Sequence, residues 1–192
     1  MKKVLILNGH QYYDMVAKGE LTQSFIDKAN EFFLKNGFEV KHTHIEKGYN
    51  IEEECEKFQW ADYILFQYPV FWMGLPWIAK KYIDETFTQG IHYSSDGRSR
   101  SDESKTYGSG GLLKGKYMLS LTYNCPTSEF SNKAGFFDGL SLDEAHVAVH
   151  KTFQFCGLEQ LETYSVHDIF KGDLDLDAEL EKFEKVLAKN FL

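Results

Sequence analysis

The sequence predicts an α/β protein with a doubly wound, five-stranded parallel sheet and helices on both faces. Short apolar segments typical of buried strands alternate with longer segments of helical periodicity. Strands that are separated by helix-length segments run parallel, because each connection crosses back over the sheet. The 192 residues, of which 43% are hydrophobic, are enough for one core, so we expect a single domain at 1–192.

The N-terminal part of the chain predicts a strand, a helix and a second strand. Lys3–Leu7 is an apolar run closed by a turn, as in a strand that is buried on both faces. Apolar residues then recur at helical spacing over Leu21–Phe33, and Gly37 stands where a left-handed residue would end the helix. Phe38–Ile45 alternates apolar and polar residues and is predicted to be the second strand.

The next segment predicts a helix, a strand and another helix. Asn50 and Glu53 have the spacing of a capping box and open a short acidic helix. Asp62–Gln67 is predicted to be the third strand, and Pro69 ends it. Pro76 suits the first turn of the helix that follows.

Residues 89–115 interrupt this rhythm. The segment is rich in Ser, Gly and charge and is long for an inert connection, so we expect a functional excursion. After it, Ser141 and Glu144 frame a capping box, and Gly157 ends the helix that this box opens. The remaining predicted elements are strands at Tyr117–Thr122 and Glu162–Val166 and a closing amphipathic helix at Leu176–Phe191.

The composition argues against nucleic acid, membrane and metal as partners. A net charge of −8 repels polyphosphate, and no apolar stretch reaches the roughly 18 residues of a transmembrane segment. Cys55, Cys125 and Cys156 lack a CxxC pair, which fits a reducing, cytoplasmic location. His146 and His150 lie four apart, but the HExxH glutamate is missing, so we expect no metal site.

Ligands of open α/β sheets bind beyond the carboxyl ends of the strands, which makes the loops 8–20, 68–75 and 123–140 the candidate site. The first loop leads into a helix N-terminus at Leu21–Ser24, whose free N–H groups and positive dipole end can hold phosphate. An ordinary loop with capping hydroxyls is the alternative. The GxGxxG and GxxxxGK motifs are absent, which disfavours Rossmann-type binding of a nicotinamide.

Aromatic side chains crowd the second loop, directly after a buried strand. Residues 68–77 read YPVFWMGLPW, and such rings are costly to expose unless a flat group covers them. A planar ring cofactor is one cover, and the protein's own core or a dimer interface is the alternative. The third loop adds polar atoms at Thr122–Cys125, but no neighbouring motif makes Cys125 a nucleophile.

Four strings of residues carry a resemblance to a known family: Pro69–Trp77, Lys80–Asp84, Tyr107–Leu112 and Gly115–Thr122. Together they resemble the NAD(P)H:quinone oxidoreductase family of flavodoxin-like proteins, and the match extends over nearly the whole chain. The resemblance implies a flavodoxin-like sheet of strand order 2-1-3-4-5, a homodimer, and FAD bound non-covalently at the dimer interface. It also implies two-electron, ping-pong hydride transfer from NADPH or NADH to the flavin and then to a quinone.

The resemblance also implies which residues hold the flavin. The diphosphate would lie on Ala17, Lys18, Gly19, Glu20, Leu21, Thr22, Gln23 and Ser24. The ring would lie near Pro69, Val70, Phe71 and Trp72, with further contacts from Tyr107, Thr122, Tyr123, Asn124 and Cys125. Tyr107 is the candidate catalytic residue, because its phenol can donate to the quinone oxygen. The alternative for Tyr107 is packing against the flavin.

Three other functions stay open on the sequence alone. A nitro- or azo-compound reductase would use the same reduced flavin, a flavodoxin-type electron carrier would need a protein partner, and a non-catalytic module would bind no flavin. The excursion at 89–115 and the aromatic loop favour an enzyme, because a carrier needs no substrate slot. Arg98, Arg100 and Lys105 either meet the 2′-phosphate of NADPH or are solvated loop charges, so the donor is undecided.

Overall fold

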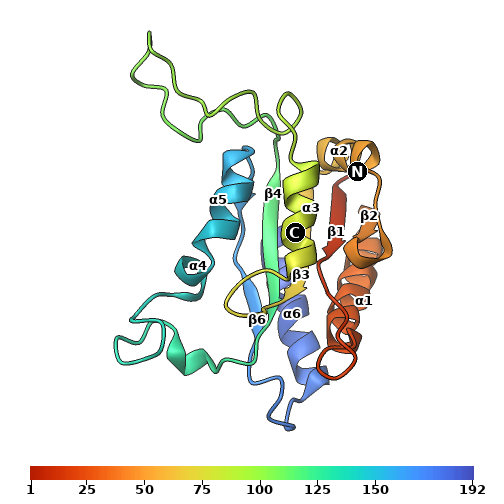
Figure 1. Cartoon of the computed structure of the whole chain (residues 1–192). Coiled ribbons are helices and arrows are strands. Elements are labelled where there is room, and N and C mark those ends of the chain that lie inside the picture. Colours follow the sequence, from red (N-terminus) through yellow and green to blue (C-terminus); the bar gives the residue numbers. More distant parts are fainter.

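A parallel sheet forms the middle layer of the molecule, and helices cover both of its faces (Figure 1). This computed structural model describes residues 1–192. The strands are β1 (Lys3–Asn8), β2 (Glu39–His44), β3 (Tyr63–Pro69), β4 (Lys116–Thr122), β5 (Glu159–Gln160) and β6 (Tyr164–Val166). The helices are α1 (Glu20–Lys35), α2 (Ile51–Trp60), α3 (Trp77–Thr86), α4 (Leu142–Ala145), α5 (Val147–Phe155) and α6 (Leu176–Phe191). The strand order β2-β1-β3-β4-β5 confirms the predicted fold class and order.

The fifth position of the sheet differs from the predicted single strand at Glu162–Val166. Two short strands occupy it, because β5 pairs with the start of β4 and β6 pairs with its end. Between them the chain leaves the ladder, and the Glu162 carbonyl accepts a hydrogen bond from Asn190 Nδ2 at 3.0 Å. A side chain of α6 therefore satisfies the backbone at the interruption, and no local sequence pattern signals such a contact.

The helix predicted after Ser141 is also divided. Its capping box is present, since Ser141 Oγ accepts from the Glu144 N–H and the Glu144 carboxylate accepts from the Ser141 N–H. The helix then breaks at His146, whose imidazole is buried against the rings of Tyr68 and Tyr123. This tertiary contact separates α4 from α5 and explains why periodicity alone predicted one helix.

The two faces of the sheet bury different side chains. On β4, Tyr117 and Leu119 face α2, α3 and α5, whereas Met118 faces α1 and α6, as the two-residue period of a strand requires. The α1 and α6 face is packed by aromatic rings, among them Phe25 and Phe183 at 5.2 Å. None of the helices has both the length and the apolar character that a membrane crossing requires.

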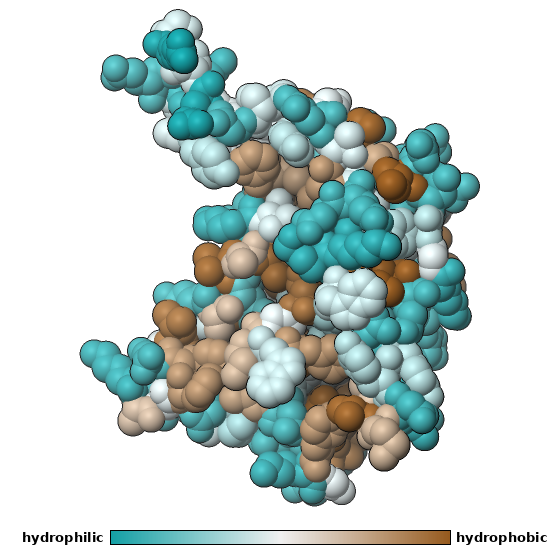
Figure 2. Space-filling view, viewed as in Figure 1, coloured by the Kyte–Doolittle hydropathy of each residue, from teal (hydrophilic) through white to brown (hydrophobic).

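The excursion lies between α3 and β4 and therefore leaves the molecule at the amino-end edge of the sheet (Figure 1). Most of it projects as an arm, residues 94–110, whose base is closed by the Ser94 N–H donating to the Gly110 carbonyl at 2.8 Å. Gly110 has to be a glycine, because a Cβ there would lie 2.1 Å from the Ser95 carbonyl oxygen. In Figure 2 the arm is hydrophilic, and apolar side chains gather on the hollowed face beside it.

Candidate functional site

A cavity of about 190 Å³ lies at the carboxyl-end edge of the sheet. Residues 16–22 form one wall, and Pro69, Phe71 and Thr122 form the other. The first two loops that the sequence singled out thus meet at one place, together with Thr122 at the end of β4, because the carboxyl ends of adjacent parallel strands share an edge.

Helix α1 begins at this cavity without a side-chain cap on its first N–H groups. Gly19 precedes it with φ 93, and a Cβ at this position would lie 2.9 Å from the imidazole of His10. Only glycine allows this turn so close to the ring, and the turn leaves the first N–H groups of α1 free to bind an anion. This part of the loop has the local structure that a phosphate site needs.

Two side chains that were predicted to contact the phosphate form hydrogen bonds within α1 instead. The Ser24 hydroxyl donates to the Glu20 carbonyl at 3.0 Å, and Gln23 Nε2 donates to Asp27 at 2.7 Å. Both side chains line a neighbouring polar cavity of about 440 Å³ instead. The backbone of α1, rather than these side chains, is therefore the better anion ligand.

His10 belongs to the site although the sequence reasoning did not name it as a ligand. It lines both cavities, and its side chain is buried, which lowers its pKa and favours the neutral ring. Nε2 lies 3.2 Å from the Ala17 carbonyl oxygen and has to be the donor, because a carbonyl only accepts. Nδ1 is then a buried acceptor without a partner, suited to a sugar hydroxyl. Its position just beyond a buried strand was the available signal.

Further unpaired polar atoms lie on β3 and β4, two residues before Pro69 and Thr122, which line the cavity. Gln67 and Ser120 are neighbours in the β3–β4 register, and both are buried. Neither the Gln67 amide nor the Ser120 hydroxyl has a protein partner. An unpaired buried polar group costs about 1–3 kcal/mol, and neither side chain lines the cavity, so ordered water is the partner that suits these atoms.

A tight hairpin at Phe71–Gly74 projects from the end of β3. Two backbone hydrogen bonds close it, at 3.0 and 3.1 Å, with Trp72 at φ 49 and Met73 at φ 65. Left-handed backbone is strained for such residues and is concentrated at functional sites. The Trp72 side chain is 95% exposed and borders an apolar cavity of about 500 Å³ that Tyr13 and Val70 also line. The hairpin thus offers aromatic surface that a planar ring can cover.

The third loop contributes less than predicted. Thr122 lines the cavity, but Tyr123 points to the other face of the sheet, where its ring stacks on His167 at 5.9 Å. Consecutive residues of a strand alternate in direction, which accounts for this difference. Asn124 Oδ1 accepts from the Phe170 N–H at 3.1 Å. Cys125 is only partly exposed, and burial raises the pKa of its thiol, which is unlike a nucleophile.

Ile169 and Phe170 line the cavity and were missed by the sequence reasoning. They follow β6, the last strand, so they come to the same edge as the other loops. The Phe170 side chain is 60% exposed. The signal was present in the sequence: two apolar residues directly after a strand end, in a segment that had been assigned no role.

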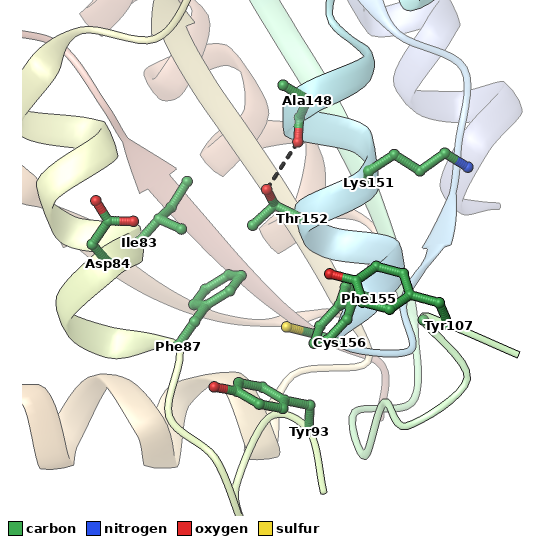
Figure 3. Close-up of a pocket in the computed structure, with 11 residues that line it drawn as sticks. Ile83, Asp84, Phe87, Tyr93, Tyr107, Ala148, Lys151, Thr152, Phe155 and Cys156 are labelled. Carbon is green, nitrogen blue, oxygen red and sulfur yellow. Dashed lines mark hydrogen bonds between the residues drawn. The ribbon is translucent and has the colours of Figure 1, made fainter. Parts of the chain in front are cut away.

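Tyr107 lies at the opposite edge of the sheet from all these residues. It belongs to the arm, its side chain is 70% exposed, and its ring packs on Phe155 at 5.5 Å. Together with α3 and α5 it borders a separate cavity of about 610 Å³ (Figure 3). One copy of the chain does not bring Tyr107 to the other predicted flavin ligands.

His146 and His150, which the sequence considered as metal ligands, form contacts with buried tyrosines. The Tyr117 hydroxyl lies 2.9 Å from His150 Nδ1, and the Tyr68 hydroxyl lies 3.5 Å from His146 Nδ1. These two histidines are buried on the α5 face of the sheet. No group of three or more His, Cys, Asp or Glu side chains is arranged to hold a metal ion.

Comparison with known proteins places this geometry in a family. The family model described as flavodoxin-like fold matches residues 2–190. The NADPH:quinone oxidoreductase MdaB of Haemophilus influenzae is 40% identical over 188 residues, which cover 93% of this chain and 97% of that protein.

Two solved structures share the fold. A protein assigned as a quinone reductase from Klebsiella pneumoniae has a TM-score of 0.79 and 19% identity, over 98% of this chain and 85% of that one. General stress protein 14 of Treponema denticola, solved in complex with FMN, has a TM-score of 0.70 and 18% identity, over 98% and 97% of the two chains. These similarities support the fold alone. The family model and the H. influenzae relative go further: this chain belongs to the NAD(P)H:quinone oxidoreductase family of flavodoxin-like proteins.

Proposed function

We propose that the protein is an FAD-dependent NAD(P)H:quinone oxidoreductase that works by a two-electron, ping-pong mechanism. The observation that carries the proposal is the meeting of an uncapped helix N-terminus, an unpaired His10 nitrogen and a strained aromatic hairpin at one edge of the sheet. When bound there, the flavin supplies hydride storage between the nicotinamide and the quinone.

The residues of the cavity have distinct roles in this proposal. The N–H groups that follow Gly19 hold the diphosphate at the positive end of α1. His10 Nδ1 accepts a hydrogen bond from a sugar hydroxyl of the flavin. Pro69 and Phe71 support the ring, and Trp72 and Tyr13 exclude water from the apolar cavity in front of it. No side chain needs to act as a nucleophile.

The preference for FAD over FMN would come from the loop after β6. Ile169 and Phe170 extend the cavity with apolar surface beyond the start of α1, where an adenine ring could stack. Phe170→Ala should weaken FAD binding by about tenfold and leave FMN binding unchanged, since one stacked base contributes about 1–3 kcal/mol. Phe136→Ala, at a similarly exposed ring outside this cavity, is the control. Release of FMN alone from the purified protein would contradict the FAD assignment.

A homodimer is proposed because the two halves of the expected site lie at opposite edges of one chain. A second copy can bring its Tyr107 to the hairpin at Trp72, and the exposed rings at both places would then be covered. The expected result in analytical ultracentrifugation is a dimer at micromolar protein. A monomeric holoprotein would rule this arrangement out.

Tyr107→Phe tests the role of the phenol. Loss of one hydrogen bond to the quinone oxygen should slow quinone reduction roughly tenfold to a hundredfold, while reduction of the flavin by the nicotinamide is unchanged. Stopped-flow measurement of the two half-reactions separates these effects. Equal rates in the quinone half-reaction for variant and wild type would assign Tyr107 to packing.

The activity itself is tested with the purified yellow protein. NADPH or NADH should bleach the flavin under anaerobic conditions, a quinone should restore its colour, and steady-state plots should give parallel double-reciprocal lines. Parallel measurements with nitro and azo compounds determine which acceptor has the highest kcat/KM. If neither nicotinamide bleaches the flavin, the oxidoreductase proposal is wrong and the electron-carrier alternative gains support.

A further inference from the structure

The segments that follow β4 and β6 stay together after the two strands have ended (Figure 1). The parallel ladder stops at Thr122 and Val166, which are paired in register. Beyond the ladder the Tyr123 N–H donates to the Val166 carbonyl at 2.8 Å, and the Ile169 N–H donates to the Tyr123 carbonyl at 3.4 Å. The position of the segment after β6 is therefore set by the segment after β4.

We call residues 167–170 the β6 loop, and the cavity of about 190 Å³ at the start of α1 the flavin cavity. Ile169 and Phe170 are the two residues of the loop that line this cavity, and different contacts hold them. Ile169 packs against the core on the α1 and α6 face. The Phe170 side chain is mostly exposed, but its backbone N–H donates to Asn124 Oδ1 at 3.1 Å. Asn124 thus fixes the backbone from which the Phe170 ring projects.

His167 joins the same two segments on the opposite face of the sheet. Its Nδ1 lies 2.7 Å from the Cys125 carbonyl oxygen and has to be the donor, because a carbonyl only accepts. In the neutral ring Nε2 is then an acceptor, and the Ser165 hydroxyl donates to it at 2.8 Å. The ring also stacks on Tyr123 at 5.9 Å. One tautomer of His167 therefore ties the β6 loop to the segment after β4.

The backbone between these two ties is strained. Asp168 has φ 54, a left-handed conformation that residues other than glycine adopt at a cost. Such strain persists where the surrounding contacts fix the chain, and it is concentrated at functional sites. Here the contact of His167 lies on one side of Asp168 and the contact of the Phe170 N–H on the other. The strained turn brings the next two residues to the flavin cavity.

We propose that Asn124 and His167 are positioning residues that hold the β6 loop as the outer wall of the flavin cavity and thereby set the preference for FAD over FMN. FMN has no adenosine half, so the start of α1 can hold its phosphate without this wall. FAD needs the wall, because the Phe170 ring can stack on an adenine only while the loop keeps its place. The inference rests on the proposed function but needs only one copy of the chain.

The first test titrates the flavin-free full chain with FAD and with FMN and follows flavin fluorescence. Asn124→Ala removes the acceptor of the Phe170 N–H, so it should weaken FAD binding about fivefold and leave FMN binding within about twofold. Asn132→Ala should change neither affinity. It is the matched control, because Asn132 Oδ1 accepts from the Ala134 N–H at 3.0 Å in a part of the chain that does not line the cavity.

The outcomes of this titration separate the inference from the proposed function. An equal loss for both flavins in Asn124→Ala, or no loss for FAD, overturns the inference. Equal affinities of the wild type for FAD and FMN overturn it as well, because no preference is then left to set. If the wild type binds neither flavin, the proposed function fails instead.

A double-mutant cycle tests whether Asn124 acts through Phe170. Phe170→Ala alone is expected to weaken FAD binding about tenfold. If Asn124 acts by placing this ring, Asn124→Ala should cause no further loss of FAD affinity once the ring has been removed. Losses that multiply in the double variant would show that the two residues act independently, and would overturn the positioning role.

Two variants of His167 separate its hydrogen bond from its ring. Asparagine can place an amide donor near the position of Nδ1, whereas phenylalanine keeps a ring against Tyr123 but has no donor. His167→Asn should therefore retain the preference for FAD, and His167→Phe should reduce it about fivefold. Retained FMN binding shows that each variant is folded. An unchanged preference in both variants, or a loss in His167→Asn alone, overturns the role assigned to His167.

Discussion

The two faces of the sheet are stabilised by different chemistry. The face covered by α1 and α6 is packed by phenylalanines such as Phe33 and Phe183. The face covered by α2, α3 and α5 buries Glu54, His92 and His146 among its apolar residues. The two faces thus share one sheet but differ in how they should respond to pH.

This difference corresponds to the position of the functional loops. The Phe71–Gly74 hairpin and the base of the arm are anchored on the polar face, where Val70 and Phe87 pack against the core. Polar groups there fix specific geometries through hydrogen bonds, at the cost of desolvation. The aromatic face, in contrast, is stabilised mainly by packed rings, with the Tyr164 hydroxyl donating to Glu179 at its margin.

The largest effect is expected on the aromatic face. Phe183 is fully buried, and its ring packs on Phe25 at 5.2 Å and on Tyr164 at 4.9 Å. Phe183→Ala should lower the free energy of unfolding by about 4 kcal/mol, because it removes apolar burial and leaves a cavity. Denaturant titration at pH 7 and pH 5 should give the same loss at both values, since the titratable group among these partners, Tyr164, has a pKa that burial raises, far above this range. A loss that grows at pH 5 would contradict the assigned difference between the faces.

The polar face should lose stability in acid. Burial lowers the pKa of His92 and of His146 to about 4, against about 6.5 for an unfolded histidine. As the pH falls from 6.5 towards 4, the unfolded chain binds protons that the folded chain excludes. The free energy of unfolding is therefore highest above about pH 6.5 and decreases between pH 6.5 and 4, by roughly 3 kcal/mol for each imidazole.

Non-titrating variants isolate this effect. His92 Nδ1 accepts from the Thr88 N–H at 3.1 Å, and an asparagine can keep that acceptor. The double variant His92→Asn and His146→Asn should have a flatter stability profile between pH 6.5 and 4 than the wild type. His42→Asn, on the exposed edge strand β2, should retain most of the slope. An unchanged slope in the double variant would show that other groups cause the acid sensitivity.

A smaller effect is expected at Glu54. Its buried carboxylate accepts from the Tyr82 hydroxyl at 2.5 Å, from the Thr43 hydroxyl at 2.7 Å and from Lys57 Nζ at 2.6 Å. Glu54→Gln keeps the shape but leaves too few acceptors for these donors, and should cost about 2 kcal/mol. Glu53→Gln, on the exposed side of the same helix, should cost little in the same thermal or denaturant titration. An equal loss of unfolding free energy for both variants would show that the buried Glu54 carboxylate does not stabilise the polar face.

The helix and strand positions could be predicted because they depend on local periodicity, whereas the strand order was predicted from the resemblance to flavodoxin-like proteins. The sequence did not predict the interruption at Glu162 or the break at His146, because distant side chains cause them. The direction of Tyr123 could have been derived from the alternation of β4. The place of Tyr107 could also have been derived, since a segment that follows a helix and precedes a strand starts at the amino-end edge. That His10 Nδ1 is buried without a hydrogen-bond partner could not be predicted from the sequence, because it depends on the packing of distant residues.

The smallest change in the free energy of unfolding is expected at the Phe71–Gly74 hairpin, which is anchored on the polar face and contains strained backbone. Met73 has φ 65, a conformation that glycine adopts freely and that other residues adopt at a cost. Met73→Gly should therefore raise the free energy of unfolding by about 0.5–1 kcal/mol. Ser131→Gly, at φ 54 in the loop after β4, is the matched control and should give a similar gain. The two variants should differ in flavin affinity, because only Met73 belongs to the hairpin that is held rigid against the proposed ring site. A weaker flavin complex for Met73→Gly alone would show that the strain maintains a preformed aromatic surface. Equal flavin affinities in both variants would mean that the left-handed residues at this hairpin are a local feature without a role in the site.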